Sequence, residues 1–149
     1  MTTIFKTISL SLLITVMAFT SCKKDDVQND SETKKALISR TWQMQTVTTY
    51  TSGVPFVSYQ RGAADNEEDY SLVQQTYKSN GSIHWVDQFG DTGTDGTYQL
   101  LQNDTKIKIG YAAMGLSIVG ENLQVNASKY SYTLLHGDGD STRFEFSPL

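Results

Sequence analysis

From residue 41 to its end, the chain is a series of short alternating segments separated by turn-forming residues, and this pattern favours antiparallel β-structure. The first segment, residues 41 to 50 (TWQMQTVTTY), is rich in β-branched and aromatic residues, with Trp42 and Met44 on one face and Gln43 and Gln45 on the other. Further strands are predicted near residues 70 to 78, 82 to 88, 96 to 101, 105 to 111, 115 to 119, 122 to 127, 129 to 135 and 141 to 147.

The breaks between these segments carry turn residues. Asn80 and Gly81 accept the positive φ angles of a tight hairpin, and residues 91 to 96 and 120 to 122 are predicted to turn in the same way. About eight to ten short strands joined by such turns close most economically as an antiparallel up-and-down β-barrel, which removes unpaired edges. A β-sandwich is the alternative that the spacing leaves open.

Two segments of the domain are not predicted to be strands. A short helix is expected at about residues 31 to 39, where Ser31 can cap the first turn and Leu37 is part of an apolar face. A long insertion separates the first strand from Tyr70 and contains the acidic run 65 to 69 (DNEED). We expect a solvated loop there. The alternative is a lid over the barrel mouth, because residues 54 to 59 (VPFVSY) are apolar enough to fold back over a cavity.

The N-terminus has the layout of a secretory signal peptide. Lys6 precedes an apolar run from Ile8 to Phe19, which is too short to span a bilayer as a permanent helix. Small polar residues then lead to Cys22, the single cysteine of the chain. An unpaired cysteine in an exported protein is prone to intermolecular pairing, so its chemical modification is the simplest account of its position and number.

Residues 19 to 22 (FTSC) resemble the lipobox of bacterial lipoproteins, in which the cysteine is lipidated and becomes the mature N-terminus. Lys24-Asp25-Asp26 resembles a short signal that sends lipoproteins of one Gram-negative phylum to the outer face of the outer membrane. These resemblances imply a lipid anchor at Cys22 and an outer-membrane location. They divide the chain into a signal peptide (1–21), a flexible tether (22–30) and one domain (31–149).

Three further segments carry a resemblance to a family. Residues 37 to 44 (LISRTWQM), 76 to 82 (TYKSNGS) and 95 to 100 (DGTYQL) resemble motifs of the small lipocalin-like lipoproteins of Gram-negative bacteria. The resemblance covers most of residues 33 to 147 and implies a lipocalin-like β-barrel with Trp42 on its floor. The chain has Arg40 where lipocalins carry a glycine.

Catalysis is not expected. His84 alternates with Ile83 and Trp85 and so is predicted to point away from the core, while His136 opens a glycine-rich turn. Residues 91 to 102 lack two of the oxygen ligands that an EF-hand needs, and no cofactor motif is present in the sequence. The formal net charge of −4 offers no electrostatic footprint for nucleic acid.

The expected function is therefore binding. A barrel of this size holds one small ligand or is filled by its own side chains. If a cavity is present, we expect a small hydrophobic or amphipathic ligand, held by inward-facing residues, with Met44, Tyr98, Ile109, Leu116 and Phe146 as the candidates. A structural or protein-interaction module with a filled core is the main alternative, and a glycan-capturing accessory protein is a third.

Overall fold

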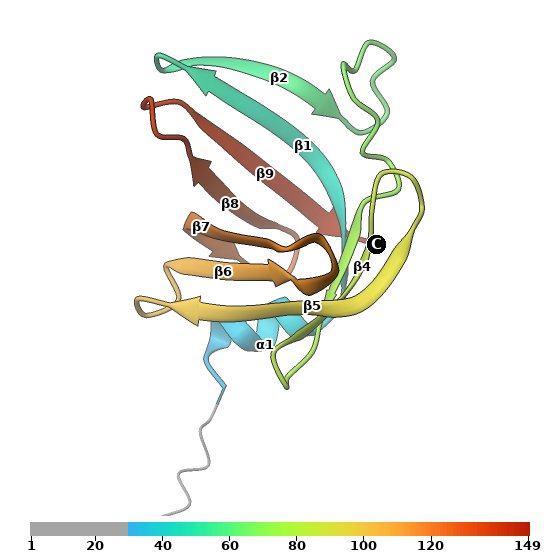
Figure 1. Cartoon of the computed structure of the whole chain (residues 1–149), viewed down its shortest axis with the longest axis vertical. Coiled ribbons are helices and arrows are strands. Elements are labelled where there is room, and N and C mark those ends of the chain that lie inside the picture. Colours follow the sequence, from blue (N-terminus) through green and yellow to red (C-terminus); the bar gives the residue numbers. More distant parts are fainter. Residues whose placement is uncertain (1–29) are drawn as a thin grey trace, which may run out of the picture.

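A computed structural model describes residues 30–149, which form nine strands, one α-helix and one short 3-10 helix (Figure 1). The predicted signal peptide, Cys22 and the tether as far as residue 29 lie outside the described residues. Within residues 30–149, no helix has both the length and the apolar character needed to cross a membrane. The elements are α1 (Glu32–Ile38), β1 (Thr41–Thr51), β2 (Val54–Gln60), β3 (Gln74–Tyr77), β4 (Ser82–Val86), β5 (Thr92–Leu101), β6 (Lys106–Tyr111), η1 (Ala112–Met114), β7 (Leu116–Val125), β8 (Tyr130–Leu135) and β9 (Ser141–Pro148).

The strands form one antiparallel sheet that closes on itself. Strands β3 to β9 are neighbours in chain order, and β1 pairs with both β3 and β9, so eight strands make a closed barrel. This arrangement confirms the predicted all-β up-and-down barrel with a short N-terminal helix, and it excludes the sandwich.

Strand β2 lies outside this ring and extends the barrel wall. It pairs with the second half of β1, from Thr46 to Thr51, whereas β3 pairs with the first three residues of β1. In Figure 1, β1, β2 and the β8–β9 hairpin rise above the wall formed by β5 to β7. Residues 54–59, for which a lid was the alternative to a loop, belong to a strand, because the positive φ angles of Ser52 (51°) and Gly53 (81°) turn the chain directly from β1 into β2.

Helix α1 covers the lower end of the barrel. The Ser31 hydroxyl accepts a hydrogen bond from the Lys34 amide at 3.1 Å, which caps the first turn. Trp42 is completely buried between the helix and the barrel interior, and its indole N–H donates to the Leu37 carbonyl at 2.8 Å. The Arg40 guanidinium lies 5.6 Å from the centre of the Trp42 ring, a cation–π contact, and its hydrogen bond to the Ala127 carbonyl joins the segment between α1 and β1 to the β7–β8 turn.

Two predicted turns are wrong, and in each case packing of an aromatic ring explains why. Residues 120 to 122 lie inside a single strand, β7, because Gly120 is covered by the Tyr132 ring: a Cβ at Gly120 would lie 2.6 Å from Tyr132 Cδ2. Asn122 (φ 52°) marks an irregularity in the β7–β8 register rather than a reversal of the chain. Strand β5 likewise starts at Thr92, four residues earlier than predicted.

Aromatic side chains pack through the barrel interior. Tyr130 is completely buried and lies against Phe146, Trp42 and Tyr77, with ring centres 4.9, 5.7 and 5.5 Å apart respectively. Tyr77 in turn meets Tyr98 edge to face at 5.0 Å. This packing occupies the part of the barrel nearest α1, so an opening for a ligand has to be sought at the other end.

Candidate functional site at the barrel mouth

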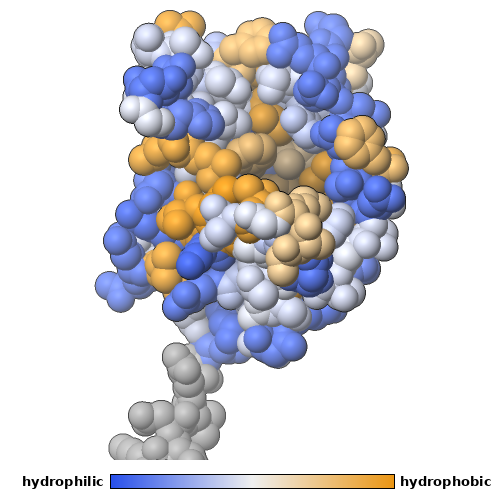
Figure 2. All heavy atoms as spheres, viewed as in Figure 1, coloured by the Kyte–Doolittle hydropathy of each residue, from blue (hydrophilic) through white to orange (hydrophobic). Residues whose placement is uncertain are grey.

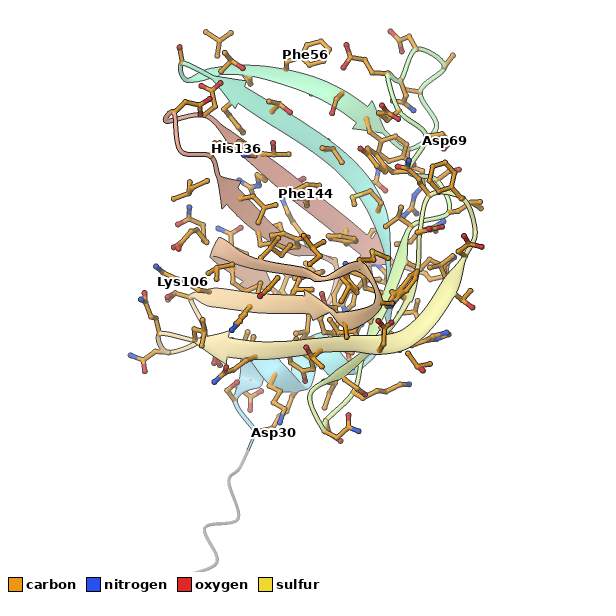
Figure 3. The ribbon with its side chains drawn as sticks, in the orientation of Figure 1. Asp30, Phe56, Asp69, Lys106, His136 and Phe144 are labelled. Carbon is orange, nitrogen blue, oxygen red and sulfur yellow. The ribbon has the colours of Figure 1, made fainter. Side chains whose placement is uncertain are left out.

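The two ends of the barrel differ in structure. One end, which we call the floor, carries α1 and the turns at residues 78–81, 102–105 and 126–129. The opposite end, the mouth, is formed by the segments 52–53, 61–73, 87–91, 112–115 and 136–140. Figure 3 shows Asp30 below the floor, whereas Phe56, His136 and Asp69 lie toward the mouth.

A pocket of about 270 Å³ opens at the mouth. Its apolar walls come from Val73, Trp85, Val86, Phe89, Tyr111 and Met114, and Gln75 and Asp87 are among its polar residues. Hollows of about 410 Å³ at the floor and 500 Å³ beside the 61–73 loop are larger, but mostly polar side chains line them. An apolar pocket with a few polar groups is the usual form of a small-molecule site, so the mouth pocket is the candidate site.

Two glycines position Trp85 on the pocket wall. Gly93 lies opposite Trp85 in the β4–β5 register, and a Cβ there would lie 2.4 Å from the Trp85 ring. A Cβ at Gly96 would lie 3.2 Å from the same ring. Their missing side chains therefore leave the space that the indole occupies. The indole N–H donates to Asp95 Oδ1 at 2.9 Å, and Tyr111 meets the ring edge to face at 5.9 Å.

A chain of hydrogen bonds leads from the pocket into the core. Gln75, only 6% exposed, donates through Nε2 to the Tyr111 hydroxyl at 2.9 Å and accepts through Oε1 from the Tyr77 hydroxyl at 2.6 Å. The Tyr77 and Tyr130 hydroxyls share a further hydrogen bond of 2.7 Å. Burial raises the pKa of Tyr111 to about 12 and the pKa of Tyr77 well above 10. Both phenols are neutral at physiological pH, and Tyr111, which lines the pocket, offers a hydrogen-bonding group rather than a charge.

The structure separates the five candidate cavity residues. Met44, Tyr98, Ile109 and Phe146 are buried members of one core cluster. Leu116 lies at the mouth end of β7, opposite Tyr111, and is 43% exposed. None of the five lines the mouth pocket, and Tyr98 borders the polar hollow at the floor instead.

Beside the pocket, the mouth has a broader apolar surface. Figure 2 shows hydrophobic side chains gathered around a hollow between the projecting strands and the wall of β5 to β7. Phe144, which Figure 3 labels on β9, stacks on Tyr132 with ring centres 5.3 Å apart. Phe56 on β2 is 53% exposed. Apolar side chains are therefore also exposed outside the pocket, on the projecting strands.

The insertion is shorter than predicted and is held together by Asn66. The Asn66 side chain accepts from the Gln60 amide at 2.8 Å and donates to the Gln60 carbonyl at 3.0 Å, which ties the loop to the end of β2. Tyr70 packs edge to face on Tyr59 at 5.5 Å. The acidic residues of the run 65 to 69 lie on a surface loop rather than over the mouth pocket.

Neither of the two histidines lines the mouth pocket. His84 is exposed on β4, and His136 Nε2 lies 2.9 Å from Thr142 Oγ1 across the β8–β9 hairpin. Asp140 Oδ1 accepts from the Ser52 amide at 2.9 Å and so joins the tips of two hairpins. Among residues 30–149, no group of three or more His, Cys, Asp or Glu side chains is arranged to hold a metal ion.

The residues of the mouth pocket were not among the sequence candidates. Alternation places Trp85 on the inward face of its strand, but it does not show which inward residues stay open to solvent. That depends on how Gln75, Trp85 and Tyr111, from three different strands, come together at the mouth.

The chain matches no protein-family model and no curated protein sequence.

Proposed function

We propose that this protein is a non-catalytic binding protein, lipid-anchored at the outer membrane, which takes a small hydrophobic or amphipathic molecule at the mouth of its barrel. The mouth pocket is the observation that carries the proposal. Its walls are aromatic and aliphatic, and Gln75 and Tyr111 supply hydrogen-bonding groups at its base. Its volume of about 270 Å³ is near the lower end for ligand sites, so it suits a small molecule or one end of a longer one.

The position of residue 30 supports the anchored arrangement. Asp30 lies at the floor beside α1, so the described chain begins at the end opposite the mouth. A tether of residues 22–29 on a lipidated Cys22 would attach the floor end to the membrane and leave the mouth facing away from it. Membership of the lipocalin-like lipoproteins is part of this proposal and rests on the motifs around Trp42 and in the hairpins.

Binding is favoured over catalysis by the state of the groups around the pocket. Tyr111 is a neutral phenol, because burial raises its pKa to about 12. Both oxygens of Asp95 already accept hydrogen bonds, from the Trp85 indole at 2.9 Å and from the Ala113 amide at 2.7 Å. These groups are arranged to hold the pocket wall in place.

A non-catalytic interaction module is the second candidate, and the aromatic interior favours it. Tyr77, Tyr130 and Phe146 pack where a deep ligand cavity would otherwise lie. Exposed apolar side chains at the mouth, including Phe56 and Phe89 (53% and 79% exposed), could then contact a partner protein. The two candidates differ in whether a small molecule occupies the mouth pocket.

Saturable binding of a neutral apolar fluorescent probe, N-phenyl-1-naphthylamine, to purified residues 28–149 tests the proposal. We expect about one probe per chain and a higher melting temperature of the complex, by linkage. Met114→Trp should weaken binding because the indole would occupy the pocket. Val119→Trp, at an exposed outward-facing position of β7, is the matched control and should bind like the wild type.

Mass spectrometry of the protein purified from its native membrane complements this test, because a co-purified molecule would identify the ligand class. If the wild type binds no probe and carries no small molecule, the interaction module becomes the better account. Equal binding by the Met114→Trp variant would place the ligand outside the mouth pocket.

A further inference from the structure

Charged side chains are unevenly distributed along the barrel axis. In the mouth segments and the adjoining start of β5, nine carboxylates are present: Asp65, Glu67, Glu68, Asp69, Asp87, Asp91, Asp95, Asp138 and Asp140. Arg61 is the single Lys or Arg side chain in these same segments. Its guanidinium donates to the Met44 carbonyl at 2.9 and 2.6 Å, so it is directed at the backbone of β1. These segments therefore carry a large excess of negative over positive side chains.

Two of these carboxylates are fixed at the mouth pocket. Asp87 lines the pocket, and its Oδ1 accepts from the amides of Phe89 and Asp91 at 2.8 and 2.9 Å, which holds the carboxylate against the pocket wall. Asp95 does not line the pocket, but its Oδ1 accepts a hydrogen bond from the indole N–H of Trp85, which does. The Ala113 amide, followed by the Trp85 N–H, lowers the pKa of Asp95 below its ordinary value, so this group stays ionised at neutral pH.

The pocket wall itself suits a positive charge. Trp85 and Tyr111 both line the pocket and meet edge to face, and aromatic faces attract ammonium and guanidinium groups. Organic cations are commonly recognised by aromatic side chains with a carboxylate nearby. A metal ion does not fit, because residues 30–149 contain no suitable cluster of ligating side chains and the pocket is mostly apolar.

We propose that the ligand of the mouth pocket is an organic cation, with an ammonium or guanidinium group beside an apolar or aromatic body. This inference rests on the proposed binding function and adds the charge of the ligand to it. The cationic group lies beside Asp87 and the Trp85 and Tyr111 rings, and the apolar body contacts Val73 and Met114. An anionic ligand of the same shape is disfavoured by the surrounding carboxylates.

Three water-soluble probes of similar size test this inference: benzyltrimethylammonium, benzyl alcohol and benzenesulfonate. The mature lipoprotein in nanodiscs of zwitterionic lipid is titrated with each probe by saturation-transfer NMR, with empty nanodiscs as the reference. We expect the cation to bind roughly tenfold more tightly than the alcohol and the sulfonate to bind weakest. Higher salt should weaken binding of the cation and leave the alcohol unaffected.

The variant Asp87→Asn removes the charge and keeps an oxygen that can accept from the two amides of the turn. It should weaken binding of benzyltrimethylammonium at least threefold without changing that of benzyl alcohol. Asp104→Asn, in a turn at the floor, is the matched control and should leave both affinities unchanged. Equal affinity of the wild type for all three probes, or cation binding that is insensitive to salt, would overturn the charge inference while the pocket remained a binding site. Binding of none of the probes would count against the proposed function as well.

Discussion

Replacing Trp42 with alanine is expected to lower the free energy of unfolding by about 3 to 5 kcal/mol, a large part of the roughly 5 to 15 kcal/mol that stabilises a typical domain. The Trp42 side chain is completely buried between α1 and the barrel interior, with its ring 5.7 Å from that of Tyr130. An aromatic side chain of this size buries about 200 Å², worth about 5 kcal/mol at roughly 25 cal/mol per Å². Removing the ring also leaves the Leu37 carbonyl without its donor.

The variant Trp42→Phe separates these two contributions. Phenylalanine keeps much of the apolar contact with Tyr130. It cannot donate to the Leu37 carbonyl, which is buried where α1 meets the barrel. An unsatisfied buried acceptor costs about 1 to 3 kcal/mol, so we expect the phenylalanine variant to be less destabilised than the alanine variant. A similar loss for both would mean that the hydrogen bond, rather than the ring, supplies most of the stability.

Urea unfolding of residues 28–149, followed by far-ultraviolet circular dichroism, measures both losses on the same scale. Circular dichroism is chosen because the substitutions remove a fluorophore. Phe89→Ala is the matched control: that ring is 79% exposed, and its removal should change stability by less than about 0.5 kcal/mol. A loss below about 1 kcal/mol for Trp42→Ala would refute the reasoning, since it would show that the floor of the barrel does not depend on this residue.

Three other predictions concern the anchor, the location and the response to alkali. Cys22→Ala should abolish incorporation of labelled palmitate and release the protein from membranes; unchanged fractionation of the variant would argue against lipidation. Replacing residues 24–26 with alanines should reduce the accessibility of the protein to protease on intact cells, while lipidation persists. If the wild-type protein is itself inaccessible, the outward-facing location is wrong. Burial raises the pKa of Tyr111 to about 12 and the pKa of Tyr77 well above 10. The stability that these neutral phenols contribute is therefore fully present below pH 10. It is lost as the pH rises through their folded-state pKa values. Ultraviolet titration should find these phenols ionising only with unfolding or above pH 10, and titration of every tyrosine near pH 10 in the native protein would contradict their burial.

Much of the fold could be predicted because its signals are local. The alternation of Trp42 and Met44 with Gln43 and Gln45 predicts a half-buried strand from neighbouring residues alone, and Asn80-Gly81 predicts the β3–β4 hairpin, where Gly81 has a φ of 86°. A series of such strands and tight turns has few closed arrangements, and the up-and-down barrel is the simplest of them. The helix follows in the same way from Ser31 and the apolar residues after it.

Other features depended on contacts between distant residues, and local patterns misread them. Gly93, Gly96 and Gly120 indicate turns when only their neighbours in sequence are considered, yet each lies within a strand. The glycines are needed there because Trp85 at Gly93, Ile83 at Gly96 and Tyr132 at Gly120, all from neighbouring strands, occupy the space that a Cβ would fill. Turn propensity and close approach of a ring call for the same residue, so the sequence alone could not distinguish the two causes.

The sequence by itself determined most of the strands, their antiparallel order and the helix cap, because each of these depends on residues a few positions apart. Only the tertiary structure decided where the barrel stays open. Met44 and Phe146 face inward, as Gln75 and Trp85 do, but the first pair is covered by other rings and the second pair borders the mouth pocket. Whether an inward side chain is covered depends on the strand registers and on the rings contributed from across the barrel, and these are set by packing of the whole domain.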